Sequence, residues 1–336
     1  MLTVSRVIDL GFIMTQWIAT AAAAGILIAI GGPGAAQTYP DHIIKAVVPY
    51  TAGGPIDVTT RVVAKRLSEV LGQPIIVENR AGAQGMIANK VVATADPDGY
   101  TLLLGNTSTL AIFPALVRTR DFDVLKRLAP VAKLTQGYEV MVVDPAGPAH
   151  TLPAFIAYAR TNPGKLNYGS SGFGNLTHVA AELLKLKAGI EMQHVPNKGA
   201  PEVVAGLVSG QVHAAFIDIV GVLPLARQGK VLPLAIASAT RDQKAPEIPT
   251  FIEQGLADFL VPTFTGVLAP AGTPPAIVTK LHDAINSVLA HAESRALLEN
   301  VGTSVRPGTV DEFAVFLANE QHKWEEVAVL AGIRGE

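Results

Sequence analysis

The glycine-rich turn VVPYTAGGPID, residues 47–57, has the residue types of an anion-binding site. An apolar strand runs into Gly53 and Gly54, and a helical pattern then starts at Pro55 and carries Asp57 in its first turn. Glycines leave backbone amides uncovered, and the first amides of a helix lack intrahelical partners and carry partial positive charge. The segment therefore predicts a site built from backbone donors. The alternative is an ordinary turn in which Asp57 only complements the helix dipole.

A second turn of the same kind, LNYGSSGFGNLTH over residues 166–178, follows another apolar strand. Two such turns, one from each half of the chain, would grip both ends of a small anion in a cleft between them. Helix starts and neutral donors can hold a carboxylate without a lysine, so we predict a carboxylate site. The second turn would contribute Ser170, Ser171, Gly172, Gly174 and Asn175.

These turns do not match the known nucleotide-binding or catalytic motifs. Gly172 and Gly174 lack the third glycine of a dinucleotide fingerprint, and Tyr168 stands where a nucleophile elbow has its first glycine. No lysine followed by serine or threonine completes a phosphate loop. We therefore interpret Ser170 and Ser171 as hydrogen-bond donors and expect no enzymatic activity. A serine hydrolase that uses one of them with a histidine remains the remote alternative.

The histidines do not have the spacing of a metal site. His178 and His194 lie in different predicted elements, and no acidic cluster accompanies them. We expect no metal and no cofactor, and we expect His178, near the start of its helix, to make a structural hydrogen bond. Either histidine would serve as the base in the hydrolase alternative.

Asp218 ends the apolar run VHAAFID, residues 212–218. An acid at the end of a strand in an open α/β sheet points toward the crevice where such sheets bind ligands. Facing an anion, this acid would have to accept a hydrogen bond from water, an amine or a protonated carboxyl group. Ligand contact and a structural role both remain open for Asp218 at this point.

Short apolar runs alternate with helical patterns from His42 onward, which predicts an α/β fold with mainly parallel sheets. The first helix has a glycine stop at Gly72. A first series of strands is expected at residues 43–49, 75–78, 101–105 and 128–134, and a second at 140–143, 166–168, 192–195, 212–217 and 231–237. Helices are expected at residues 177–188, 201–208, 274–299 and 310–329.

The two series of strands predict two α/β domains, with the chain crossing between them near Gly137 and near Pro262. Domain 1 would combine residues 37–138 with 263–336, including the C-terminal helices, and domain 2 would be residues 139–262. The ligand cleft would lie between them. The alternative is one large doubly wound domain.

The first residues predict export. Arg6 precedes an apolar run from Ile18 to Ile30, and the small residues Gly34 and Ala36 fit cleavage after residue 36. Because the run is too short to span a bilayer, we predict a cleaved signal peptide over residues 1–36 and a periplasmic mature protein. The alternative is an uncleaved N-terminal anchor.

Composition narrows the class further. The 336 residues are 49% hydrophobic and 16% charged, as in a globular protein. The absence of cysteine excludes disulfides, thiolate metal sites and a lipid-modified cysteine. The formal net charge of −2 gives no indication of nucleic acid or of an anionic membrane surface as a partner. We expect a soluble monomer.

From about Tyr39 to its C-terminus the sequence resembles the Bug family, the substrate-binding proteins of tripartite tricarboxylate transporters. The resemblance rests on motifs in a fixed order. They are VVPYTAGGPID with Arg61, GQPIIVENRAGAQG (72–85), ADPDGYTLLLGN (95–106), NPGKLNYGSSGFGNLTH (162–178), HVPNKGAPE (194–202), APAGTPPAIV (269–278) and the closing Glu320, Lys323 and Trp324.

This resemblance implies a two-domain periplasmic binding protein fold, type II-like, that closes around its ligand without changing it. The ligand would be a mono-, di- or tricarboxylate, aliphatic or aromatic, delivered to the permease subunits of the transporter in the membrane. A liganded form that signals to a membrane sensor kinase is the alternative.

The resemblance also implies which residues contact the ligand, partly through water. With the neighbouring positions of both turns included, domain 1 would contribute Thr51, Ala52, Gly53, Gly54, Asp57 and Asn106. Domain 2 would contribute Ser170, Ser171, Gly172, Gly174, Asn175, Asn197 and Asp218.

Several positions depart from the usual family residues, which affects the expected ligand more than the expected fold. Asn197 stands where the family has tyrosine, so its shorter amide would enlarge the pocket and replace an aromatic wall with a polar one. The other departures are Thr51 for alanine, Gln84 for glycine, Asn175 for threonine and Phe264 for tryptophan.

Overall fold

The computed structural model describes residues 39–116, 123–300 and 304–333, and its helices and strands all belong to the unit His42–Glu336. The predicted signal peptide, residues 1–36, lies outside the described residues. None of the described helices combines the length and the apolar character that crossing a membrane requires.

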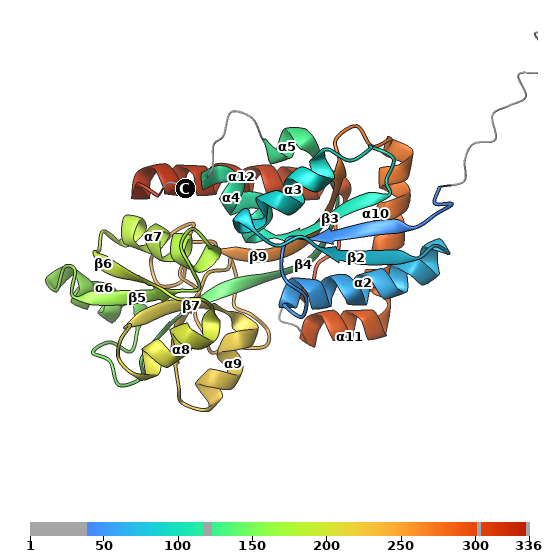
Figure 1. Cartoon of the computed structure of the whole chain (residues 1–336). Coiled ribbons are helices and arrows are strands. Elements are labelled where there is room, and N and C mark those ends of the chain that lie inside the picture. Colours follow the sequence, from blue (N-terminus) through green and yellow to red (C-terminus); the bar gives the residue numbers. More distant parts are fainter. Residues whose placement is uncertain (1–38, 117–122, 301–303, 334–336) are drawn as a thin grey trace, which may run out of the picture. The chain divides into compact units, whose positions relative to one another are not determined.

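The described strands form one ten-stranded mixed sheet in the order β2-β1-β3-β9-β4-β7-β5-β6, with β8 and β10 each paired to β4 (Figure 1). Their bounds are β1 Ile44–Val48, β2 Ile75–Asn79, β3 Thr101–Asn106, β4 Leu128–Val143, β5 Leu166–Ser170, β6 Met192–Pro196, β7 Ala214–Asp218, β8 Leu232–Ile236, β9 Pro262–Pro270 and β10 Ser304–Val305.

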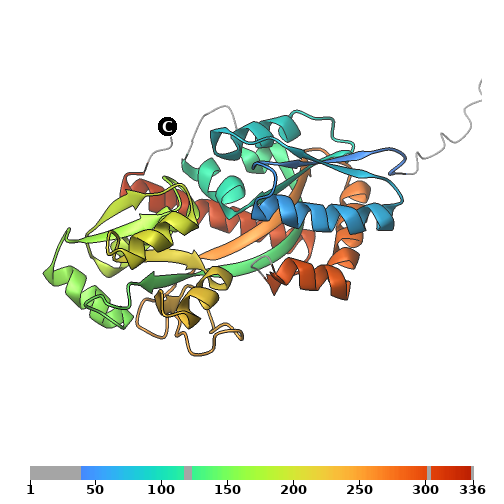
Figure 2. The same cartoon turned by 60° about the horizontal axis from the view of Figure 1, so that its bottom comes forward.

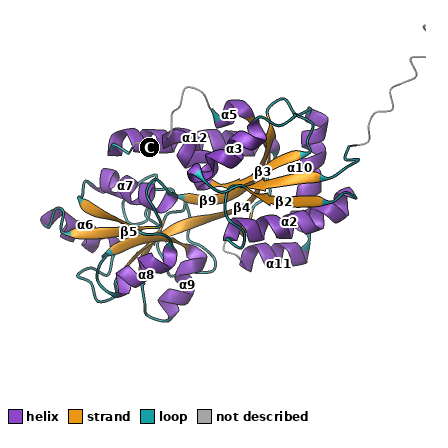
Figure 3. Ribbon diagram, viewed as in Figure 1, coloured by secondary structure: helices purple, strands orange, loops and turns teal. Residues whose placement is uncertain are grey.

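Helices connect and cover the strands (Figure 3). The α-helices are α2 Pro55–Leu71, α3 Met86–Ala93, α4 Phe113–Leu116, α5 Val124–Arg127, α6 Leu152–Thr161, α7 Leu176–Ala188, α8 Ala200–Val208, α9 Ile219–Arg227, α10 Pro275–Ala290, α11 Ala292–Asn300 and α12 Val310–Ala331. A 3₁₀ turn, η1, covers Ala83–Gly85, and a π-helix, η2, covers Ser108–Ile112.

Two groups of parallel strands confirm the predicted α/β class. Strands β1, β2 and β3 pair in parallel, as do β5, β6 and β7. Figure 1 shows α2 and α3 on opposite sides of the first group, and α7 and α8 on opposite sides of the second. Strand β1 is mostly buried, because helices cover both of its faces. The sheet is mixed rather than mainly parallel, because β9 and β4 join the two groups through antiparallel pairs and β8 adds a further antiparallel pair with β4.

Strand β4 corrects the strand prediction between residues 128 and 143. The two expected strands are one continuous strand of 16 residues, which pairs with β9 in its first part and with β7 and β8 in its last part. Gly137, expected at a crossing between two sheets, lies inside this strand opposite Thr263. Strand β9 was not predicted at all. The chain therefore passes from one parallel group to the other through two paired strands.

Helix ends follow local chemistry. Helix α2 begins with Pro55 in its first turn and ends at Gly72, whose φ of 69° is left-handed, as the glycine stop predicts. The single helix expected over residues 274–299 is wrong: His291 has an extended backbone, with φ −70° and ψ 126°, and separates α10 from α11. Helix α12 begins with a capping box made by Thr309 and Glu312.

One buried apolar cluster lies under both parallel groups, so their packing is continuous. It includes Val47 and Leu103 in the first group, Tyr168 and Phe216 in the second, and Trp324 of α12. Helix α12 packs on β4, α4 and α7 (Figures 1 and 2). The architecture holds the ends of β3 and β7 and the starts of α2, α7 and α9 around one cavity.

Candidate functional site

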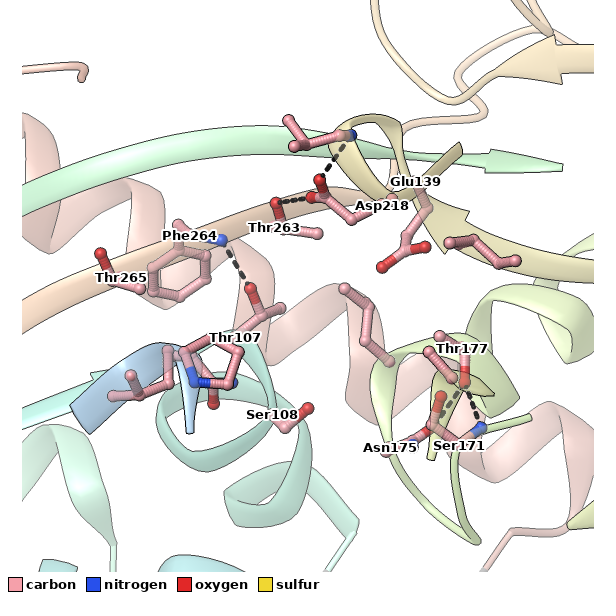
Figure 4. Close-up of a pocket in the computed structure, with 18 of the residues that line it drawn as sticks. Thr107, Ser108, Glu139, Ser171, Asn175, Thr177, Asp218, Thr263, Phe264 and Thr265 are labelled. Atoms are coloured by element: carbon pink, nitrogen blue, oxygen red, sulfur yellow. Dashed lines mark hydrogen bonds between the residues drawn. The ribbon is translucent and has the colours of Figure 1, made fainter. Parts of the chain in front are cut away.

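A cavity of about 630 Å³ is lined by residues from both parallel groups and from the strands that join them (Figure 4). Its polar lining is mostly neutral hydroxyl and amide groups. Apart from Glu139 and Asp218, no charged side chain is among the described lining residues. Within the described ranges no group of three or more histidine, aspartate or glutamate side chains is placed to hold a metal ion. The polar residues of the cavity lining that Figure 4 labels are Thr107, Ser108, Glu139, Ser171, Asn175, Thr177, Asp218, Thr263 and Thr265.

Asn106, at the end of β3, is fixed by its neighbours and still lines the cavity. Its Oδ1 accepts hydrogen bonds from the Tyr50 hydroxyl at 2.8 Å and from the backbone amide of Thr109 at 3.2 Å. Burial raises the pKa of Tyr50 to about 12, so its phenol stays a donor. Because the oxygen is occupied, the amide nitrogen of Asn106 is the group that can donate to a ligand.

The π-helix η2 starts two residues after this asparagine, and its N-cap Thr107 and first residue Ser108 complete this side of the cavity. Thr107 accepts a hydrogen bond from the backbone amide of Phe264 at 2.8 Å, which ties the start of η2 to β9. Ser108 is among the lining residues (Figure 4). Single π-turns are frequent at functional sites, but the sequence prediction contained no such element.

The start of α7 faces the cavity from the second parallel group. Asn175 caps the helix by accepting from the backbone amide of His178 at 3.1 Å and from the Thr177 hydroxyl at 2.9 Å. The Thr177 hydroxyl in turn accepts from the backbone amide of Ser171 at 2.9 Å. Pro55 and Ile56 bring the start of α2 to the same cavity. The structure thus places the two predicted turns beside one another.

Asp57 serves the first turn itself. Its Oδ2 accepts from the backbone amide of Gly53 at 2.8 Å and from Arg61 at 2.9 Å, and its Oδ1 accepts from Asn79 at 2.9 Å. The hydrogen bond from Arg61, with those from Gly53 and Asn79, lowers the pKa of Asp57 to about 2. The carboxylate is therefore occupied by protein donors and does not line the cavity.

Ser170 is fully buried and contacts a histidine outside the cavity. Its Oγ lies 2.6 Å from Nε2 of His194 and donates to the carbonyl of Gly172 at 3.1 Å. The His194 ring stacks on His178, with 4.0 Å between ring centroids. His178 accepts from the backbone amide of Gly174 at 3.0 Å, so the structural hydrogen bond expected of it is present.

Asn197 turns toward its own strand end. Its Nδ2 donates to the carbonyls of Val195 at 2.9 Å and of Ser170 at 3.3 Å, and it does not line the cavity. Of the residues expected to contact ligand, the cavity lining contains Asn106, Ser171, Asn175 and Asp218. Ligand contact stays a prediction for all of them, including those outside the lining: Thr51, Ala52, Gly53, Gly54, Asp57, Ser170, Gly172, Gly174 and Asn197.

Asp218 has the structural role that the sequence left open, and it also lies at the cavity. It caps α9 by accepting from the backbone amide of Val220 at 3.0 Å, and it accepts from the Thr263 hydroxyl at 3.0 Å. Burial raises the pKa of Asp218 to about 6, against the effect of these two donors. The same side chain lines the cavity.

Glu139 is a lining residue that sequence reasoning missed. It lies on β4 directly opposite Asp218 of β7, and its side chain points into the cavity (Figure 4). The residue is 4% exposed, and its Oε2 is buried with no hydrogen-bond partner among the described residues. Burial, and then the nearby Asp218, raise the pKa of Glu139 well above its usual value. The available signal was a single acid within the apolar run YEVMVV.

This mixed α/β fold, with a cavity of neutral donors between two parallel groups, defines a two-domain solute-binding protein of the periplasmic type. The sequence model described as "Tripartite tricarboxylate transporter family receptor" matches residues 59–332, and the chain belongs to this family, the Bug family. The family consists of substrate-binding receptors, so the chain is a receptor and not an enzyme. The hydrolase alternative is thereby excluded.

Individual relatives cover nearly the whole chain. Protein BugT of Bordetella pertussis is 35% identical over 317 residues, which are 92% of this chain and 96% of that protein. MatC of Rhodopseudomonas palustris, solved with bound malate, is 34% identical with a TM-score of 0.73, and the match covers 86% of this chain and 99% of MatC. A second R. palustris protein, solved with adipate, is 32% identical with a TM-score of 0.75, covering 88% and 99%.

Proposed function

We propose that this receptor captures a small carboxylate in the periplasm and delivers it to the permease subunits of a tripartite tricarboxylate-type transporter. The observation that carries the proposal is the meeting of two helix starts, α2 and α7, at a cavity whose described lining has no lysine, arginine or histidine. Neutral donors and helix starts suit an anionic group that is bound and later released. The malate and adipate in the two related structures support the same ligand class.

The proposed grip places the ligand carboxylate between the Asn106 amide nitrogen, the Ser108 hydroxyl and the start of α7 at Asn175 and Thr177. Each of these groups lines the cavity and can donate or is adjacent to backbone amides that can. We propose the domain division that the sequence predicts, residues 37–138 with 263–336 and residues 139–262, with closure around the ligand.

The proposed location follows from the family and from the predicted signal peptide over residues 1–36. A related structure, 35% identical with a TM-score of 0.75, is described as a periplasmic transporter. Expression of the whole chain in a Gram-negative host, followed by N-terminal sequencing of the periplasmic fraction, tests this. A mature protein that begins near residue 37 supports the proposal, and a chain retained uncleaved in the membrane contradicts it.

A thermal-shift panel of aliphatic and aromatic mono-, di- and tricarboxylates tests the ligand class. A ligand at about a hundred times its Kd adds about 2.7 kcal/mol to the free energy of unfolding, which raises Tm by about 4 °C for a chain of this length. Calorimetry on the hits should give an affinity that Asn106→Ala lowers about tenfold, while the exposed-site control Gln243→Ala leaves it unchanged. A panel in which no carboxylate shifts Tm refutes the proposal.

A further inference from the structure

Glu139 is the one described residue of the cavity lining with a buried side-chain oxygen that has no partner. The backbone of Glu139 is held from both sides of β4. On one side Glu139 lies opposite Asp218 of β7, and its backbone amide donates to the carbonyl of Val261 at 3.2 Å. A buried polar atom without a partner costs free energy, so its presence in a binding cavity calls for a partner on the ligand.

The groups around Glu139 do not supply that partner. From β7 it faces Asp218, whose oxygens already accept from Val220 and Thr263. The lining contributed by α2, β3, η2, α7 and β9 contains no titratable side chain among the described residues. Outside the lining, the charge of Asp242 raises the pKa of Asp218 and the charge of Lys244 lowers it. The acid pair therefore has no cation in the described lining.

This arrangement affects the charge of the two acids. Burial, and then the nearby Asp218, raise the pKa of Glu139 well above its usual value, so the surroundings favour the neutral form of this acid. Asp218, with two donors, has a pKa of about 6 and is mostly ionised there. A second anionic group of a ligand at this point would lie against the negative charge of Asp218. A cation would be attracted to it.

We propose that Glu139 selects a carboxylate that also carries a primary ammonium group. The inference rests on the proposed function: the ligand carboxylate is held by the neutral donors, and its ammonium lies against Glu139 and Asp218. On binding, Glu139 releases its proton to solvent and accepts a hydrogen bond from the ammonium. The ion pair then replaces a neutral acid, and the unpartnered oxygen has a donor.

Isothermal titration calorimetry with matched ligands tests the selection. The panel covers the carbon chain lengths from malate to adipate. At each length it contains the plain monocarboxylate, the dicarboxylate and two amino-carboxylates. One amino-carboxylate carries its amine next to the carboxylate, and the other carries it at the far end. The best amino-carboxylate should bind at least about tenfold more tightly than the dicarboxylate of the same length. Titration in buffers of different ionisation enthalpy should show release of about one proton near neutral pH.

Glu139→Gln keeps the side-chain shape but cannot ionise. In this variant the preference for the amino-carboxylate should fall at least about tenfold and the proton release should disappear, while the control Glu247→Gln, at an exposed position, retains both. The circular dichroism spectrum and Tm of each variant establish that it is folded. If Glu139→Gln does not fold, the wild-type panel and its proton release still decide the question.

The inference is overturned if dicarboxylates bind wild type more tightly than every amino-carboxylate, if tight amine binding releases no proton, or if folded Glu139→Gln keeps the preference. Failure of the proposed function is a different result, because there no carboxylate of any kind would bind. Dicarboxylate binding without amine binding would thus leave the receptor role in place and remove the role of Glu139.

Discussion

Replacing Asp57 with asparagine should destabilise the protein by removing the brace of the first glycine-rich turn. The new side chain would keep one oxygen for Asn79 but would turn its amide donors toward the backbone amide of Gly53 and toward Arg61, which both donate. The bond from Gly53 to a charged acceptor is worth about 1.5–2 kcal/mol. The pair with Arg61, whose side chain is 52% exposed, adds little because solvent screens it. We expect a loss of about 1.5–2 kcal/mol at neutral pH.

The pH dependence provides a second readout. The folded state holds Asp57 ionised down to a pKa of about 2, whereas the unfolded chain takes up the proton near the ordinary aspartate value. The stabilisation is therefore present at neutral pH and is lost as the pH falls through about 4 toward about 2. The difference between wild type and Asp57→Asn should shrink over the same range.

Urea unfolding followed by circular dichroism at several pH values measures both effects without any ligand. Asp283→Asn, at an exposed position on α10, is the matched control and should stay within about 0.5 kcal/mol of wild type. An Asp57→Asn protein as stable as that control, or a difference that persists undiminished at low pH, would refute the idea that Asp57 braces the turn.

Three further outcomes are expected. Ser170→Ala should lower the free energy of unfolding by about 1–2 kcal/mol, because His194 loses its buried hydrogen-bond partner. Since Ser170 does not line the cavity, the variant should keep its carboxylate affinity within about threefold of wild type. A loss of binding without a loss of stability would contradict this. Burial lowers the pKa of His178 to about 3, so unfolding takes up a proton below about pH 6 and the free energy of unfolding falls on acidification. Urea titrations at several pH values should show this: below about pH 6 the free energy of unfolding should depend more steeply on pH in wild type than in His178→Asn, by up to about 1.4 kcal/mol per pH unit. Thr263→Val removes a donor from Asp218 and should raise the pKa of that carboxyl above about 6, which NMR titration of the side-chain carbonyl would detect; an unchanged or lowered pKa would count against the assigned hydrogen bond.

The parts of the fold that follow local rules could be predicted from the sequence. The parallel strands and the helices between them have the expected positions, since apolar runs, glycine stops and first-turn prolines act over a few neighbouring residues. The antiparallel strands were harder. Gly137 normally suggests an interruption, yet here the strand β9 pairs with it from more than a hundred residues away. No local pattern reports such a partner.

For the site, too, the sequence predicts local features but not the directions of the side chains. The sequence predicts that the two glycine-rich turns form one site, and in the structure the starts of the helices that follow them, α2 and α7, line one cavity. It could not tell which way each polar side chain turns. Ser170 and Asn197 bond to neighbouring protein groups, whereas Glu139, in an apolar run, points into the cavity. Direction depends on strand register and on packing partners, which only the folded chain sets.

Strand β4 also has a consequence for how the protein unfolds. Its first part is hydrogen-bonded to β9, which pairs with β3, and its last part is hydrogen-bonded to β7 and β8, so the residues around Gly137 link the two parallel groups. Neither group can open fully without exposing a strand edge and apolar core of the other. His42–Glu336 should therefore melt in a single cooperative transition, and the central amides of β4 should be among the last to exchange with deuterium.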